Sequence, residues 1–150
     1  MSGREYPARP LVGLGVVLLR PEGLDGPAAV LLVRRGKPPN AGAWSIPGGA
    51  QKLGETAEAG ARRELLEEAG LPAGPLVLAA HVDSITRDAG GAVQYHYTIL
   101  DFAARWAGGE PRAGGDVTGA VFAPLDGLGP YALWDEAHRV IRAARALLGV

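Results

Sequence analysis

Residues 49–71 read GAQKLGETAEAGARRELLEEAGL, a stretch in which four of the glutamates, one arginine and two glycines stand at fixed spacings. Seven such positions and two apolar ones would coincide by chance in well under about one chain in a million. The spaced residues are Gly49, Glu55, Arg63, Glu64, Glu67, Glu68 and Gly70, with Leu65 and Leu71 as the apolar pair. The stretch is therefore the starting point for both fold and function.

The second half of this stretch predicts an amphipathic helix. Thr56 is the expected N-cap and Gly70 the expected residue after the C-cap, so the helix covers residues 57–69. At about 100° per residue, three glutamates share one face and an apolar sector occupies another. The glutamates are Glu64, Glu67 and Glu68, and the apolar residues expected in the core are Ala61, Leu65, Leu66 and Ala69.

Three carboxylates on one helical face repel each other. Such pairs destabilise a helix by about 0.2 to 0.5 kcal/mol each, and at the C-terminal end they also oppose the helix dipole. A hard divalent cation such as Mg²⁺ or Mn²⁺ would offset this repulsion, because these ions bind oxygen ligands. The alternative is a solvated acidic face paired with Arg62 and Arg63. The complete spacing pattern favours the metal site.

The pattern G-x5-E-x7-R-E-U-x-E-E-x-G-U, where U is apolar, resembles the box of the Nudix hydrolases, and no fixed position is missing here. The resemblance implies an α/β fold, an α/β/α sandwich with a mixed sheet between two main helices. It also implies Mg²⁺ or Mn²⁺ as the cofactor. By resemblance the metal ligands are the Gly48 carbonyl and the carboxylates of Glu64, Glu67 and Glu68.

The resemblance leaves the general base open, since relatives use either a box glutamate or a later carboxylate. The box candidates are Glu67 and Glu64, and the later ones are Asp88, Glu110 and Asp116. Structural roles are expected for Gly49, Glu55, Arg63 and Gly70. Arg63 is flanked by glutamates, so we expect it to hold Glu55 or a helix carboxylate. Gly60 either keeps the acidic face open or is tolerated in the helix.

Upstream of the box, Trp44 to Gly49 predicts a short strand entering a tight glycine turn. Arg34, Arg35 and Lys37 form a basic run, and arginines suit diphosphate oxygens. We expect substrate contact from Arg34 or Arg35 rather than Lys37; the alternative is a solvated strand end. Trp44 either stacks on a base or packs in the core or at its rim.

The reaction implied by the resemblance is hydrolysis of a nucleoside diphosphate linked to another group, by a metal-activated water. ADP-ribose or a related nucleotide sugar is the first substrate, because the chain resembles bacterial ADP-ribose pyrophosphatase-like members. In the family a proline about sixteen residues beyond the box marks ADP-ribose hydrolysis, and a tyrosine there marks dinucleoside polyphosphates. This chain has Thr86, Arg87 and Asp88 in that region, so neither marker is present. The alternatives are a nucleoside triphosphate pyrophosphohydrolase, including one that removes oxidised dNTPs, and a non-catalytic nucleotide sensor.

Composition sets the remaining bounds. The 150 residues and 47% hydrophobic content suit one domain, residues 1–150, with a flexible segment at 1–10. A net charge of -1 gives no patch for a nucleic acid polymer or a membrane. Cysteine is absent and the three histidines are scattered. The expected partner is a small nucleotide, and a homodimer is a further possibility. The expected location is cytoplasmic.

The rest of the chain predicts strands at 11–20, 28–35, 76–87, 92–106 and 120–124, and a final helix at 134–148. The helix core positions are Ala137, Val140, Ile141, Ala144 and Leu148. Residues 88–91 form a hairpin signal. Gly13-Leu14-Gly15 is interpreted as part of an alternating strand and not as a dinucleotide fingerprint, because no third glycine follows.

Overall fold

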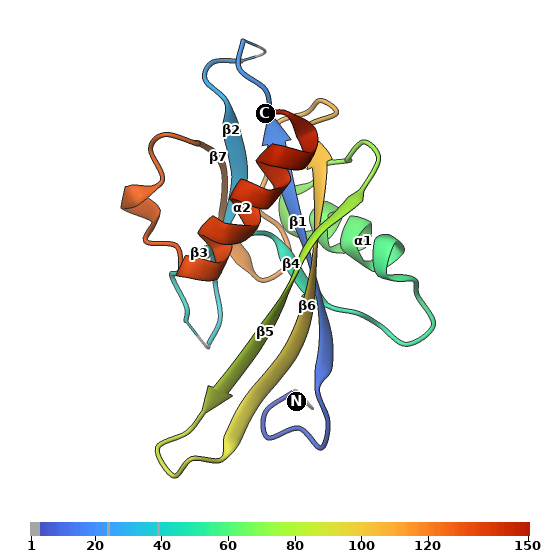
Figure 1. The fold of residues 1–150 in the computed structure, drawn as a ribbon, viewed down its shortest axis with the longest axis vertical. Helices are drawn as coiled ribbons and strands as arrows, with labels where there is room; N and C mark the ends of the chain where they lie inside the picture. The colour runs from blue at the N-terminus through green and yellow to red at the C-terminus, as the bar shows by residue number, and fades with distance from the viewer. Residues whose placement is uncertain (1–3, 24, 39) are drawn as a thin grey trace.

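The computed structural model describes residues 4–23, 25–38 and 40–150. In this part of the chain one mixed sheet lies between two α-helices, as the sequence predicts (Figure 1). The strands are β1 (Leu11–Arg20), β2 (Ala29–Arg35), β3 (Trp44–Ser45), β4 (Gly48–Ala50), β5 (Val77–Arg87), β6 (Val93–Arg105) and β7 (Val117–Pro124). The helices are α1 (Ala57–Ala69), α2 (Asp135–Leu148) and the short 3-10 turn η1 (Gly129–Tyr131).

Strand β1 is the centre of the sheet. Along one side it pairs in parallel with β6, with Gly15 opposite Asp101. Along the other side it pairs first with β4, where Gly15 faces Gly48, and then with β2, where Leu19 faces Val30. β2 continues to β3 and β7, and β5 lies outside β6. Because β4 and β2 share this edge of β1, the short strand β4 lies inside the sheet, next to helix α1.

Helices cover both faces of β1. Val17 and Leu19 pack in the cluster that includes α2, whereas Val16 and Leu18 pack in the cluster that includes α1. Every residue of β1 from position 13 to 20 is buried. The predicted strand is confirmed, but the predicted alternation of exposed and buried residues is wrong. A strand sandwiched between helices is a continuous apolar run.

Helix α1 begins and ends as predicted. The Thr56 hydroxyl accepts a hydrogen bond from the Ala59 N–H at 3.1 Å, and Gly70 ends the helix with a φ of 68°. Ala61, Leu65 and Ala69 are buried as expected. Leu66 is a correction: it is 60% exposed, because the predicted apolar sector is wider than the strip of helix that the sheet covers.

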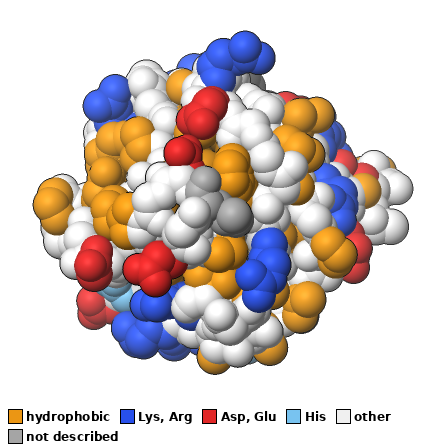
Figure 2. All heavy atoms as spheres, turned by 90° about the horizontal axis from the view of Figure 1, so that it is seen from above, with side chains coloured by type: hydrophobic (Ala, Val, Ile, Leu, Met, Phe, Trp, Pro, Cys, Tyr) orange, Lys and Arg blue, Asp and Glu red, His pale blue; other side chains and the backbone are white. Residues whose placement is uncertain are grey.

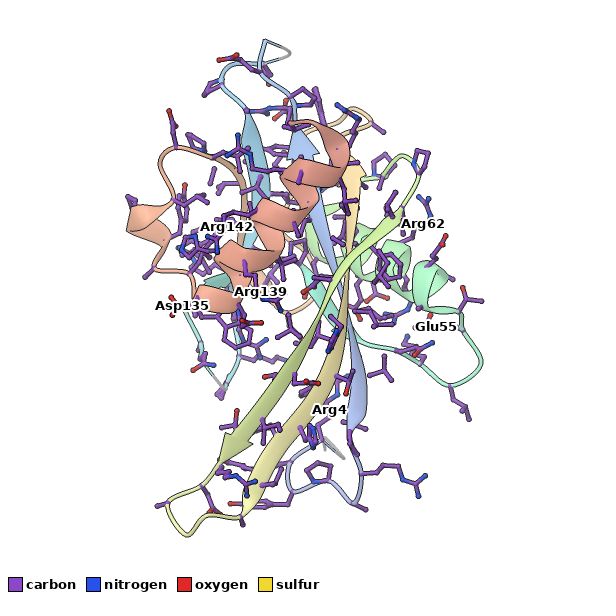
Figure 3. The ribbon with its side chains drawn as sticks, viewed as in Figure 1. Arg4, Glu55, Arg62, Asp135, Arg139 and Arg142 are labelled. Atoms are coloured by element: carbon purple, nitrogen blue, oxygen red, sulfur yellow. The ribbon has the colours of Figure 1, made fainter. Side chains whose placement is uncertain are left out.

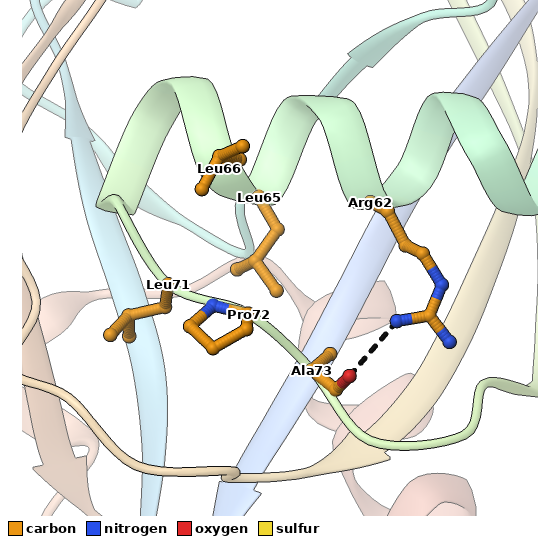
Figure 4. A pocket seen from close by; sticks show the side chains of 6 residues that line it. All are labelled: Arg62, Leu65, Leu66, Leu71, Pro72 and Ala73. Atoms are coloured by element: carbon orange, nitrogen blue, oxygen red, sulfur yellow. Dashed lines mark hydrogen bonds between the residues drawn. The ribbon is translucent and has the colours of Figure 1, made fainter.

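Leu66 instead lines a pocket of about 200 Å³ between α1 and the chain segment that follows it (Figure 4). The other lining residues are Arg62, Leu65, Leu71, Pro72 and Ala73. Arg62 donates hydrogen bonds to the carbonyls of Ala73 and Gly74 at 2.9 and 3.0 Å. Arg62 therefore anchors the loop after α1 and does not pair with the acidic face.

Helix α2 buries Ala137, Val140, Ile141 and Ala144 as expected, and Leu148 packs half-buried against the same cluster. The predicted strand ranges agree with the structure within a residue, except that β7 begins at Val117 and not at position 120. In the additional segment, Gly119 pairs with Arg34 and Val117 pairs with Arg35 at the end of β2. This pairing is set by tertiary structure, and the glycine at position 119 obscures it in the sequence.

The β5–β6 hairpin extends beyond both helices, and the chain before β1 lies beside it (Figure 1). The Tyr6 backbone N–H donates to Gln94 O, and the Tyr6 hydroxyl donates to Asp88 Oδ2, both at 2.7 Å. Residues 1–3 of the predicted flexible segment lie outside the described residues, and flexibility of 1–10 stays a prediction. Among the described residues, no helix has the length and hydropathy that crossing a bilayer requires.

Candidate functional site

The backbone of strand β4 forms a hydrogen bond with a side chain from the last turn of α1. The Gly48 N–H donates to Glu68 Oε1 at 2.8 Å. Hydrogen-bonded pairs alternate along an antiparallel ladder, and Val16 N–H donates to Pro47 O at 3.1 Å. The neighbouring pair of Gly15 and Gly48 is therefore not hydrogen-bonded, and Gly48 directs its N–H and C=O away from β1. The N–H is bound to Glu68, and the C=O points to the same side.

Glu68 sits in an environment that disfavours its negative charge. Burial raises the pKa of Glu68 to about 7, and the charges of Glu64 and Glu67 add to this effect. The Gly48 N–H and the Arg35 guanidinium oppose the shift. The Arg35 guanidinium therefore lies close enough to Glu68 to act on its charge.

The Arg63 guanidinium donates hydrogen bonds to the remaining box carboxylates. Its Nη2 and Nε donate to the two oxygens of Glu55 at 2.7 and 3.0 Å. Its Nη1 donates to Glu64 Oε1 at 2.9 Å and to Glu67 Oε2 at 3.3 Å. The bonds from Arg63 to Glu55, with one from the Lys52 N–H, lower the pKa of Glu55 to about 2. The expected pairing of Arg63 with Glu55 and a helix carboxylate is present.

The box glycines let neighbouring side chains lie against the backbone. A Cβ on Gly49 would lie 2.5 to 2.7 Å from all three atoms of the Glu64 carboxylate, and one on Gly60 would collide with Leu14 and with Glu55 Oε1. Gly60 is thus packed against β1 and Glu55, so the interpretation that this glycine is merely tolerated is wrong, and a role in keeping the acidic face open stays a prediction. The predicted tight turn at Gly48 and Gly49 is also wrong, because both lie in β4.

The donor groups fit a hard cation in kind, because all of them are oxygens. Among the described residues, no three acidic or histidine side chains converge to form a ready-made metal cage. Arg63 holds Glu64 and Glu67, and Gly48 holds Glu68. This arrangement is compatible with Mg²⁺, which keeps several waters and binds one or two carboxylates together with substrate phosphates.

The other predicted substrate residues lie away from this cluster. Arg34 donates to Thr118 Oγ1 at 2.9 Å and to Thr118 O at 3.1 Å, and its guanidinium stands 5.4 Å from the centre of the Trp44 ring. Trp44 makes an edge-to-face contact with Tyr131 at 5.2 Å. Successive strand residues face opposite sides of a sheet, so Arg34 points to the α2 side and Arg35 to the α1 side.

The later carboxylates are placed differently. Asp88 lies at the tip of the hairpin, where the Tyr6 hydroxyl holds it and lowers its pKa. Asp116 pairs with Lys37 at 3.0 Å, and Glu110 is exposed in the loop before β7. The identity of the general base, among these acids and Glu64 and Glu67, stays a prediction.

The loop at residues 107–116 has a role that the sequence did not reveal. The Arg112 N–H donates to Ala69 O at 2.9 Å, and the Gly114 N–H donates to Glu68 O at 3.2 Å. Both bonds satisfy carbonyls in the last turn of α1, which would otherwise add negative potential beside Glu67 and Glu68. The Gly114-Gly115 pair is the only local signal, since a Cβ on Gly114 would lie 2.5 Å from Glu67 O.

Sequence reasoning also missed Asp101 on β6. This side chain is buried, with 7% of the residue exposed, and its burial raises the pKa to about 6, with Arg139 opposing the shift. The signal was available: Asp101 is a lone charge between apolar residues, Leu100 and Phe102.

We expect Asp101→Asn to raise the melting temperature at pH 8 and to leave it almost unchanged at pH 4. The folded-state pKa of about 6 lies above the ordinary 3.8, so the fold favours the protonated carboxyl. Ionisation therefore destabilises the fold as the pH rises from 3.8 to 6, by about 3 kcal/mol once complete. Thermal melts across this range measure the effect, with exposed Asp83→Asn as control. A difference that does not vary with pH would contradict the buried charge.

Comparisons with known proteins give the context of this site. The NUDIX domain family model matches residues 9–144. The putative 8-oxo-dGTP diphosphatase 2 of Mycobacterium tuberculosis is 40% identical over 86 residues, 56% of this chain and 57% of that protein. The ADP-ribose pyrophosphatase of Methanocaldococcus jannaschii is 37% identical over 99 residues, 66% and 56% of the two chains. The chain thus spans about half the length of these relatives.

A solved structure extends the likeness to the whole fold. The MutT NUDIX hydrolase from Burkholderia pseudomallei superposes with a TM-score of 0.74 and 30% identity, over 90% of this chain and 98% of that one. The family model, the relatives and this fold agree with the spaced glutamates on α1. The chain therefore belongs to the NUDIX domain family.

Proposed function

We propose that the face formed by α1 and β4 hydrolyses the phosphoanhydride of a nucleoside diphosphate linked to another group, with Mg²⁺ or Mn²⁺ as cofactor. The observation that carries the proposal is the junction of Glu68 with the Gly48 backbone, beside carboxylates that Arg63 holds in place. A buried carboxylate among like charges is a frequent feature of functional sites. The first substrate is ADP-ribose or a related nucleotide sugar.

In this proposal Glu64, Glu67, Glu68 and the Gly48 carbonyl hold the cation. When bound, the cation neutralises the diphosphate and lowers the pKa of a water molecule. The chain's own residues bind the phosphates and move the proton. Arg35, whose charge acts on Glu68, donates to the phosphate oxygens.

The acid–base step is assigned to a box glutamate. Glu67 is half exposed and has one long contact to Arg63, at 3.3 Å. Glu64 is more enclosed, with 13% of its side chain exposed and a shorter bond to Arg63. Glu67 is therefore freer to take a proton from water, and Glu64 is the second candidate.

Two substrate classes have support from relatives. The name of the M. jannaschii protein supports ADP-ribose, and that of the M. tuberculosis protein supports an oxidised deoxynucleoside triphosphate. A nucleoside triphosphate pyrophosphohydrolase is therefore the second candidate. Cationic and anionic side chains are interspersed on the face shown in Figure 2, so this face has no single-sign patch for a nucleic acid polymer.

A substrate panel tests the proposal. ADP-ribose, NADH, nucleotide sugars, dinucleoside polyphosphates and dNTPs, including 8-oxo-dGTP, are incubated with Mg²⁺, Mn²⁺ or EDTA. ADP-ribose should give AMP and ribose 5-phosphate, and a dNTP should give the monophosphate and pyrophosphate. In ¹⁸O-water one label should enter one of the two products. Inorganic phosphate as the first product from every substrate, a phosphorylated enzyme, or turnover in EDTA would contradict the proposal.

A further inference from the structure

The outer edge of strand β5 is open. β5 stands at the end of the strand order and pairs with β6. Among the residues that the structure describes, no strand pairs with β5 on the side away from β6. The N–H and C=O groups along an edge strand are a template for pairing with another chain, so native folds cover or blunt such edges. The far half of β5 is neither covered nor interrupted by a proline.

Helix α2 reaches β5 only near the body of the protein. Arg139 on α2 donates to His81 O at 3.0 Å (Figure 3). Beyond this contact the β5–β6 hairpin projects past both helices (Figure 1). The chain before β1 contacts β6 there, since the Tyr6 N–H donates to Gln94 O. Residues 83–87 of β5 therefore project from the body with their outer edge uncovered.

These five residues read DSITR, a sequence that is complementary to itself when two copies run antiparallel. In a two-fold dimer the same patch of each copy forms the interface, so every facing pair occurs twice. With Ile85 on the axis, Asp83 of each copy faces Arg87 of the other, and Ser84 faces Thr86. Opposite charges and hydroxyl pairs across neighbouring strands each stabilise by roughly 0.2–1 kcal/mol, whereas facing like charges destabilise.

The side chains of these pairs are accessible. Ile85 is 49% exposed although it is apolar. Asp83 has 64% of its side chain exposed, and its ion pair with His81 Nε2 is long, at 3.8 Å. Arg87 donates from Nη1 to Gly91 O at 3.0 Å, and a guanidinium has further N–H donors. Because alternate residues of a strand share a face, Asp83, Ile85 and Arg87 lie on the same face of β5.

A shift of the axis by one residue removes this match. An axis at Ser84 would place Asp83 opposite Ile85. An axis at Thr86 would place Arg87 opposite Ile85. In each case a charged group loses contact with water against an apolar side chain and gains no partner. Only the axis at Ile85 pairs the two opposite charges.

We propose that residues 83–87 of β5 are the surface through which two copies of this chain associate, as an antiparallel strand pair with its two-fold axis at Ile85. Main-chain hydrogen bonds would continue the sheet of one copy into that of the other. Only short segments meet, so the dimer belongs to the weak class of interfaces that bury less than about 1,200 Å². The box glutamates lie on α1, away from this surface, so the inference does not rest on the proposed function.

Charge-swap variants test the register. Asp83→Arg places two arginines opposite each other at both ends of the pair, and Arg87→Asp places two aspartates there. Each variant alone should dimerise at least about 10-fold more weakly than wild type. An equimolar mixture of the two variants should restore association, because every arginine then faces an aspartate. Sedimentation velocity at low ionic strength, with protein up to about 1 mM, measures the masses.

The matched control is Asp126→Arg, the same charge change at an exposed aspartate after β7, and it should associate as wild type does. Melting temperatures verify that the variants fold. Amide hydrogen exchange of wild type gives a second readout, since residues 83–87 should exchange more slowly in concentrated than in dilute protein. A wild type that stays monomeric, a dimer that persists in Asp83→Arg alone, or a mixture that stays monomeric would each overturn the inference.

Discussion

Glu68→Gln and Glu64→Gln should each lower kcat by at least about 100-fold. Removing one charge from a preorganised electrostatic site raises the activation free energy by roughly 2.7 to 4 kcal/mol in comparable enzymes. Glu68 is the sharper test, because its amide replacement can still accept the hydrogen bond from the Gly48 N–H. Only the charge is lost. The measurement is kcat at saturating substrate and Mg²⁺.

The matched control is Glu58→Gln, an exposed glutamate in the first turn of the same helix. It changes the helix charge equally and should keep nearly the full kcat. Melting temperatures verify that all three variants fold. If Glu68→Gln and Glu64→Gln both keep a near-normal rate at saturating Mg²⁺, these residues do not hold the cation.

Gly49→Ala should lower kcat by about 10- to 100-fold although it changes no charge. The new methyl group would occupy the space of the Glu64 carboxylate, 2.5 Å from Oε1, so Glu64 must move away from Arg63. Displacing a catalytic group by about 1 Å can reduce a rate by about 100-fold. The expected signature is a lower kcat in a folded protein.

Gly129→Ala is the control for this substitution, since a Cβ at position 129 meets no atom within 4 Å. Its kcat and melting temperature should match those of wild type. An unchanged rate in Gly49→Ala would mean that Glu64 tolerates displacement and is not part of the hydrolytic site. A crystal structure of Gly49→Ala would show the position of Glu64 directly.

Local sequence features determined the box helix and most strand positions. The Thr56 cap, the Gly70 terminus and the spacing of Leu65 are properties of consecutive residues, and they predicted α1 correctly. The same periodicity placed Leu66 wrongly in the core. Helical period defines which residues share a face, but the width of the covered strip depends on the sheet beneath.

Only the tertiary structure decided how the box meets the rest of the chain. The contact of Glu68 with Gly48, the side of the sheet that Arg35 faces, and the position of Asp101 over Gly15 all depend on strand register. A shift of one residue in register would turn each side chain to the opposite face. Register is set by pairings between segments far apart in the sequence, so a lone aspartate in an apolar strand shows its charge but not its neighbours.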